Sequence, residues 1–340
     1  KLTGIAPVVA FNLAIPALFA LTAVGLFSAG SALAGRGRPS WAGGALAVVL
    51  ALLMGNLDAF GQLIGRLQAV FAGALPVGFD YWASSRVIPQ TINEFPFWTF
   101  LFADLHPHLI AMPFGMVVVG LAANWVLAAR DENFVPLSTC LLIILSLGAL
   151  GAINTWDLPT YGLLVGAALL IIGWRGGGRR LALAVPAAAA VGGLVVAAYW
   201  PFYAHYQSQV GQGEGFLLAR YLGWVRAASP LPAWFTVWGI PLILSLAALI
   251  GRWIDIKIKD RRAADRPVAA SEAPPPEPDE EADRPRPAGW MPGALALIAV
   301  LLTLLALDRP TAALMALPVG LATPLAFRRR SPPADNFAAL

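Results

Sequence analysis

The sequence predicts an all-α polytopic membrane protein, a bundle of about nine transmembrane helices, and three observations carry that prediction. Hydrophobic residues make up 58% of the chain and charged residues only 12%, whereas soluble domains are near one quarter charged. The apolar residues come in runs close to the roughly 20 residues that a helix needs to cross a bilayer. Segments that alternate polar and apolar residues, as a membrane barrel requires, are not found.

Nine segments have the composition of spanning helices, although the fifth and the last two are short for a span. They are 5–34, 41–63, 107–129, 135–154, 158–174, 181–200, 234–254, 291–307 and 311–327. The first seven predict a membrane block over residues 1–254, with long outer loops at about 65–106 and 201–233. Residues 255–289 hold the run SEAPPPEPDEEADRPRP, whose proline and mixed charge predict a disordered cytoplasmic linker. Residues 290–340 then form a two-span tail.

The basic residues predict the orientation of these spans. Most of the 23 lysines and arginines fall in alternate loops, and such loops stay cytoplasmic. The remaining basic residues, which we expect outside, are Lys1, Arg66, Arg86, Arg220, Arg226 and Arg309. We therefore expect a plasma (inner) membrane protein with the first residue of this chain outside and its last residue in the cytoplasm. The bilayer is the expected partner and nucleic acid is not, since the basic residues lie in loops between spans. The chain begins at Lys1 without a methionine, so we expect a missing N-terminal part of the same protein.

All three histidines fall on the predicted outer side, and two of them lie in the segment Asp104-Leu-His106-Pro-His108. Pro107 fits the first turn of a helix and disfavours helical geometry at His106. In an extended segment Asp104, His106 and His108 share one face and can converge on one ion or phosphate. In a helical segment only Asp104 and His108 share a face.

The alternative reading of this segment is helix capping at the membrane interface. Ionisable groups at that depth in so apolar a chain are usually functional, so we predict a site. Its candidate metal ligands are Asp104, His106 and His108, and the candidate cation is Mn²⁺ or Mg²⁺. Histidine with carboxylate suits Mn²⁺ or Zn²⁺, while Mg²⁺ prefers more oxygen ligands.

Other candidates lie in the outer loops and turns. Glu94 is a candidate general base or ligand and Arg86 a candidate phosphate clamp; the alternative is a solvated pair. Asp157, before Leu158-Pro159, fits an N-cap, which would still place it beside the site. The candidate substrate-binding residues are Arg86, Trp82, Asp157, Tyr161 and His205. For His205, an aromatic belt at the interface is the alternative.

Three segments carry a family resemblance: KLTGIAPVVAFNLAIPALFALTA, FDYWASSRVIPQTINEFPFWTFLFADLHPHLIAMPF and GAINTWDLPTY. They resemble the Chlor_Arch_YYY membrane proteins of bacteria and archaea, of which this chain would be an interior portion. The layout of that family resembles the GT-C superfamily of glycosyltransferases, which take sugars from polyprenyl-phosphate donors at the outer membrane face. The resemblance implies a metal-assisted site built from acidic residues on outer loops. The superfamily's key acidic residue lies in a first outer loop that this chain would lack.

We therefore predict a GT-C-like glycosyltransferase with Glu94, Asp104 and His108 as catalytic residues. Asp104, His106 and His108 would hold a divalent cation or the donor phosphate, and Arg86 would neutralise phosphate charge. Two other functions stay open. A transporter or lipid flippase would place polar groups and helix breaks near the bilayer midplane. A non-enzymatic assembly subunit would use the aromatic outer loops as an interface.

Overall fold

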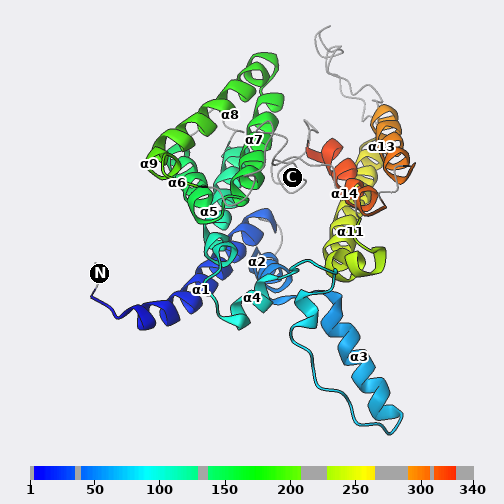
Figure 1. Ribbon diagram of the computed structural model, residues 1–340. Helices are drawn as coiled ribbons and strands as arrows, with labels where there is room; N and C mark the ends of the chain where they lie inside the picture. Colours follow the sequence, from blue (N-terminus) through cyan, green and yellow to red (C-terminus); the bar gives the residue numbers. More distant parts are fainter. Residues whose placement is uncertain are drawn as a thin grey trace. The chain divides into compact units, whose positions relative to one another are not determined.

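A computed structural model describes residues 4–34, 40–128, 137–207, 228–264, 290–306 and 310–326, and the regular structure within these ranges is entirely helical (Figure 1). The α-helices are α1 (Pro7–Ala34), α2 (Ser40–Val48), α3 (Leu57–Phe71), α4 (Pro96–Phe102), α5 (Pro107–Ala128), α6 (Leu137–Ile153), α7 (Asp157–Arg175), α8 (Gly178–Ala198), α9 (Trp200–Tyr203), α11 (Leu231–Ala264), α13 (Trp290–Ala306) and α14 (Pro310–Ala326). A π-helical turn, η1 (Val49–Leu53), continues α2, and a 3₁₀ turn, η2 (Ala83–Ser85), lies before α4. The all-α prediction is confirmed.

Within the described ranges, five helices are long and apolar enough to cross a membrane, namely α1, α5, α7, α8 and α11. A sixth candidate is the pair formed by Ser40–Leu53 and Leu57–Phe71, which bends by 76° at a short break. Helices α6 and α14 are apolar but shorter. Each of the nine segments predicted from the sequence contains a helix, but nine spans are not confirmed.

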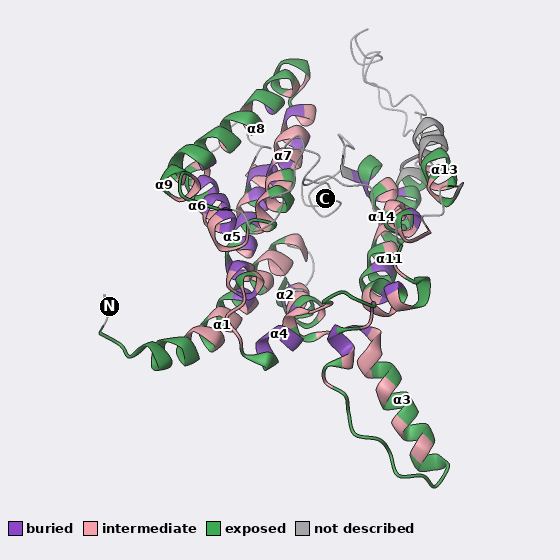
Figure 2. Cartoon of the chain, viewed as in Figure 1, coloured by how far each residue is buried: buried purple, intermediate pink, exposed green. Residues whose placement is uncertain are grey.

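The break falls inside the predicted span 41–63. The side chain of Asn56 accepts a hydrogen bond from the Asp58 amide and so caps a new helix, α3. Helix α3 is amphipathic, with Phe60, Leu63 and Leu67 on its apolar stripe. It has no buried residue, and Figure 2 shows it exposed or half-buried along its length. A separate amphipathic helix is typical of the membrane interface rather than of a span.

The chain forms two compact units, one of Lys1–Val237 with Leu325–Leu340 and the other of Trp238–Pro324. The boundary falls within α11, which continues to Ala264 and so enters the range where the sequence predicts a linker. Ion pairs of Asp255 with Arg252 and Lys259, at helical spacing, support this extension. The rest of the predicted linker, 265–289, lies outside the described residues.

Helix α5 lies at the centre of the first unit, where it packs against α1, α6 and α7. Its buried side chains include Leu109, Val118 and Trp125. The indole Nε1 of Trp125 donates to Thr139 Oγ1 of α6 at 2.9 Å. Small residues allow close helix approach in membranes, and Gly115 of α5 leaves the room that the Tyr161 ring of α7 fills. The first turn of α5 is therefore held by several neighbours.

Candidate active site

The site is built where α4 ends and α5 begins. Helix α4 ends at Ala103, whose φ of +59° lies in the left-handed region that alanine seldom adopts. The residues from Asp104 to His106 then lie outside regular structure, in a tight turn where the His106 amide donates to the Asp104 carbonyl at 2.8 Å. Helix α5 begins at Pro107, as the sequence predicts. The carbonyl of His106 accepts the Ile110 amide at 3.1 Å, so His106 stands at the helix start. His106 and His108 thus lie on either side of a change in backbone direction.

That change divides the predicted cluster into two acid–histidine pairs. The Nδ1 of His106 lies 3.1 Å from Asp104 Oδ2. The Nε2 of His108 lies 3.3 Å from Glu94 Oε2. The two imidazole rings have their centroids 5.4 Å apart. Across the described ranges, no group of three or more His, Cys, Asp or Glu side chains could hold a metal ion. The metal-ligand role of Asp104, His106 and His108 stays a prediction.

Glu94 is the most enclosed acid of the site, because its side chain is only 10% exposed. Its Oε2 is fully buried and, within the described part of the chain, accepts no hydrogen bond. The 3.3 Å contact with His108 is therefore an ionic approach without hydrogen-bond alignment. The guanidinium Nη1 of Arg86 is 3.9 Å from Oε1, at the outer limit of an ion pair. Buried polar groups are almost always satisfied, so an orphaned carboxylate oxygen indicates a place for a ligand or a proton. The alternative of a solvated Arg86–Glu94 pair does not fit this burial.

Helices α4 and α7 complete the surroundings of His108. Thr99 of α4 is fully buried, with its Oγ1 3.3 Å from His108 Nε2. The Thr99 hydroxyl is also 3.2 Å from the Phe95 carbonyl, to which it can donate. The charges of Asp157 and His108 interact, so the start of α7 belongs to the same neighbourhood. Asp157 is the first residue of α7 rather than its N-cap, a position that Trp156 takes without a side-chain hydrogen bond.

An aromatic cluster, Tyr81, Trp82, Trp98 and Phe102, forms one side of the site. The Trp98 ring is 1% exposed and stacks between Tyr81, at 4.9 Å, and Phe102, at 5.1 Å. Tyr81 Oη donates to the Trp98 carbonyl and Trp98 Nε1 donates to the Tyr81 carbonyl, at 2.8 and 3.0 Å. The Arg86 guanidinium lies 5.6 Å from the Trp82 ring centroid. Trp82 is 49% exposed and Phe102 is 37% exposed, so Trp82 is the more open ring that the cluster presents to a ligand.

The pKa of Tyr81 reports the same environment. Burial of the phenol raises this pKa above its ordinary value of 10.0, and the negative charge of Glu94 raises it further. The loop before α4 therefore carries the aromatic cluster and Glu94 together.

His205 belongs to a different set of contacts. Its Nδ1 lies 2.9 Å from the Pro201 carbonyl, within one helical turn. The neighbouring Tyr206 accepts a hydrogen bond from Thr155 at 3.2 Å, which ties this segment to the turn before α7. Among the described contacts, none joins His205 to Glu94 or His108. Most of the predicted second outer loop, 208–227, lies outside the described residues.

Sequence reasoning overlooked two buried polar residues that build the site. In the sequence, Thr99 is an ordinary residue of an apolar helix. Only its place in the fold, one turn after Phe95, brings its hydroxyl to His108. Asn56 is 7% exposed, and its Nδ2 donates to the Ser84 carbonyl at 2.5 Å. The sequence does contain a signal for Asn56, because this residue precedes Asp58 at the end of an apolar run and so resembles a helix cap.

Comparison with known proteins gives a family and no activity. No curated protein matches the chain. No solved structure matches it either. Residues 1–340 match the family described as "Uncharacterized membrane protein (DUF2298)". That match covers the whole chain and agrees with its apolar helices, so the protein belongs to this family of integral membrane proteins.

Proposed function

We propose that the protein is a GT-C-like glycosyltransferase that takes a sugar from a polyprenyl-phosphate carrier at the outer face of the plasma (inner) membrane. The observation that carries the proposal is Glu94, a buried carboxylate with an unpartnered oxygen that faces His108. Such a group suits proton transfer, because a positioned base with unused acceptor capacity can take a proton from a bound hydroxyl. The substrate class is what the resemblance implies, because the DLHPH segment resembles Chlor_Arch_YYY proteins and the layout of that family resembles the GT-C superfamily.

In the proposed reaction Glu94 takes the proton of the acceptor hydroxyl. The hydroxyl oxygen bonds to the anomeric carbon of the sugar, the bond from that carbon to the phosphate oxygen breaks, and polyprenyl phosphate leaves with the electron pair. His108 stabilises the Glu94 carboxylate, and Arg86 neutralises charge on the leaving phosphate. The open ring of Trp82 offers an apolar surface for a sugar, and Asp157 and Tyr161 of α7 would bind the substrate from the other side.

A divalent cation would join this reaction through Asp104, His106 and His108, with the donor phosphate as a further ligand. A bound metal stabilises charge on a leaving phosphate. The described side chains do not form a full ligand set by themselves, so the cation would need the donor phosphate to complete its coordination.

The test measures sugar release from polyprenyl-phosphate sugars by the purified full-length protein, with and without Mn²⁺ or Mg²⁺. Glu94→Gln keeps the shape of the side chain and removes the base, so we expect at least about a hundredfold loss of turnover. Asp255→Asn serves as the control, because Asp255 is half-exposed and pairs with Arg252 and Lys259 on α11. Undiminished turnover in Glu94→Gln would refute the assignment of the base. Turnover that stops with chelator and returns with Mn²⁺ would support the cation prediction.

The bent pair of α2–η1 and α3 favours one second candidate. Transporters often place their sites at broken helices, and this break carries the buried Asn56. Reconstituted protein that moves a lipid-linked sugar across the bilayer without cleaving it would support transport and exclude the transferase.

A further inference from the structure

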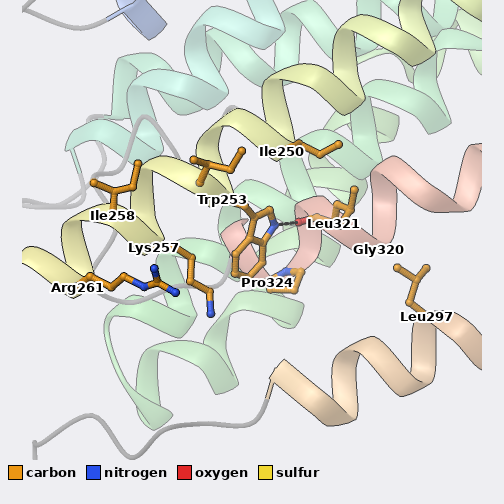
Figure 3. Close-up of a pocket in the computed structure, with 10 residues that line it drawn as sticks. Ile250, Trp253, Lys257, Ile258, Arg261, Leu297, Gly320, Leu321 and Pro324 are labelled. Carbon is orange, nitrogen blue, oxygen red and sulfur yellow. Dashed lines mark hydrogen bonds between the residues drawn. The ribbon is translucent and has the colours of Figure 1, made fainter.

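A pocket of about 690 Å³ lies within the second unit, between α11, α13 and α14 (Figure 3). Its walls are mostly apolar, and they include Ile250, Ile254, Ile258, Leu297, Leu321 and Pro324. Trp253 is fixed on the wall, because its Nε1 donates to the Leu321 carbonyl at 3.2 Å. A pocket of this size can hold much of an amphiphilic molecule.

Two cations, Lys257 and Arg261, line the same pocket beside Trp253 (Figure 3). They stand one helical turn apart on α11, where two like charges repel. In the part of the chain that the structure describes, no ion pair joins either of them to an acidic side chain. Two nearby cations of α11 are compensated, since Arg252 and Lys259 contact Asp255 at 2.9 and 3.0 Å. An anion between Lys257 and Arg261 would relieve the repulsion.

The cations also stand at the end of a candidate span. The candidate span within α11 runs over Leu231–Lys259, so Lys257 stands at its end and Arg261 just beyond it. Bilayer phosphates lie at the ends of spans, and a basic pocket between helices there suits an anionic headgroup. The three pocket isoleucines Ile250, Ile254 and Ile258 are close to half-exposed, as a surface that meets an acyl chain requires.

We infer that this pocket binds an anionic phospholipid of the bilayer. The headgroup phosphate would contact Lys257 and Arg261, and an acyl chain would run along the isoleucines and Trp253. Arginine offers a planar fork for two phosphate oxygens and lysine a compact point charge. The inference does not depend on the proposed glycosyl transfer.

Brominated lipids provide the test, because bromine on an acyl chain quenches a tryptophan that it touches. Full-length protein is placed in phosphatidylcholine nanodiscs that contain a minor share of brominated phosphatidylglycerol or brominated phosphatidylcholine. The chain has 12 tryptophans, so the signal of Trp253 is the difference between wild type and Trp253→Phe. We expect stronger quenching of Trp253 by the anionic lipid. Each cation removed should lower the preference about fivefold, and Lys257→Gln with Arg261→Gln should lower it about thirtyfold.

Lys259→Gln is the matched control, since it removes the same charge from the same helix outside the pocket and should keep the preference. The exchange Lys257→Arg with Arg261→Lys should also keep it. Retained lipids counted by native mass spectrometry give a second measurement that does not use Trp253. Equal quenching by both lipids, or a preference that survives loss of both cations, would overturn the inference. So would displacement of the lipid by inorganic phosphate, which would indicate an anion site without an acyl chain.

Discussion

Two acid–histidine pairs flank the turn between α4 and α5, and they differ in how far their carboxylates are exposed to solvent. The Asp104–His106 pair is the closer one at 3.1 Å, but its side chains are 48% and 38% exposed. The Glu94–His108 pair is 3.3 Å apart, and its carboxylate is 10% exposed. An exposed pair contributes about 0–1 kcal/mol, because water solvates each charge separately. A buried carboxylate depends on its neighbours, so burial rather than distance identifies Glu94–His108 as the candidate site.

The pairs also differ in what builds them. Asp104 and His106 are two residues apart in one tight turn, so they meet without help from the rest of the fold. Glu94 and His108 come from opposite sides of α4 and meet only when that helix is in place. The second pair therefore exists only in the folded protein.

The largest expected effect separates the two histidines. His108→Ala should lower the rate of sugar release by about a hundredfold, because Glu94 loses the imidazole that lies 3.3 Å from its buried oxygen. His106→Ala should change the rate by less than about threefold, since an exposed pair contributes little. The measurement compares the rates of sugar release of the two variants under the same conditions. Equal losses in both variants would contradict the comparison and favour a cation shared by both histidines.

The fold class could be predicted from composition, but the broken second span could not. Hydropathy averages over a whole window, so a short break inside an apolar run leaves no trace in it. The break depends on tertiary contacts, namely the hydrogen bond from Asn56 to Ser84 and the packing of the Phe95 ring on Gly55. The continuation of α11 into the predicted linker depends on the pairing of Asp255 with Arg252 and Lys259.

For the site, the sequence predicted the start of α5 at Pro107 and not the pairing of the histidines. Proline fixes φ and lacks a backbone N–H donor. Its preference for the first turn of a helix is therefore local and can be predicted from the sequence. The pairing of Glu94 with His108 depends on Ala103 in the left-handed region, which no local rule favours for alanine. It also depends on Thr99, which faces His108 only after the chain has turned back.

An intermediate effect, on stability, is expected from the packing of α5 against α7. A Cβ at Gly115 would collide with the Tyr161 ring, so Gly115→Ala should destabilise the protein by about 1–2 kcal/mol. Gly120 lies on the same helix with open space around its Cα, and Gly120→Ala should leave stability unchanged or raise it by up to about 1 kcal/mol. Thermal unfolding midpoints in one detergent rank the variants. Equal midpoints for Gly115→Ala and wild type would show that Tyr161 moves without cost.

The smallest effect concerns Tyr81, whose ionisation is sensitive to the charge of Glu94 and not to that of Asp104. Its pKa is raised above 10.0, first by burial and then by Glu94, so the folded protein keeps a proton that the unfolded chain releases. The stability from this group is fully present below about pH 10 and falls as the pH rises from there.

The absorbance of tyrosinate, taken as wild type minus Tyr81→Phe, gives the midpoint of the Tyr81 titration. Glu94→Gln should lower this midpoint while leaving it above that of an exposed tyrosine, because burial is the larger cause, and Asp104→Asn should leave it in place. If Glu94→Gln leaves the midpoint unchanged, the carboxylate beside His108 carries no charge. The general base would then have to be another residue.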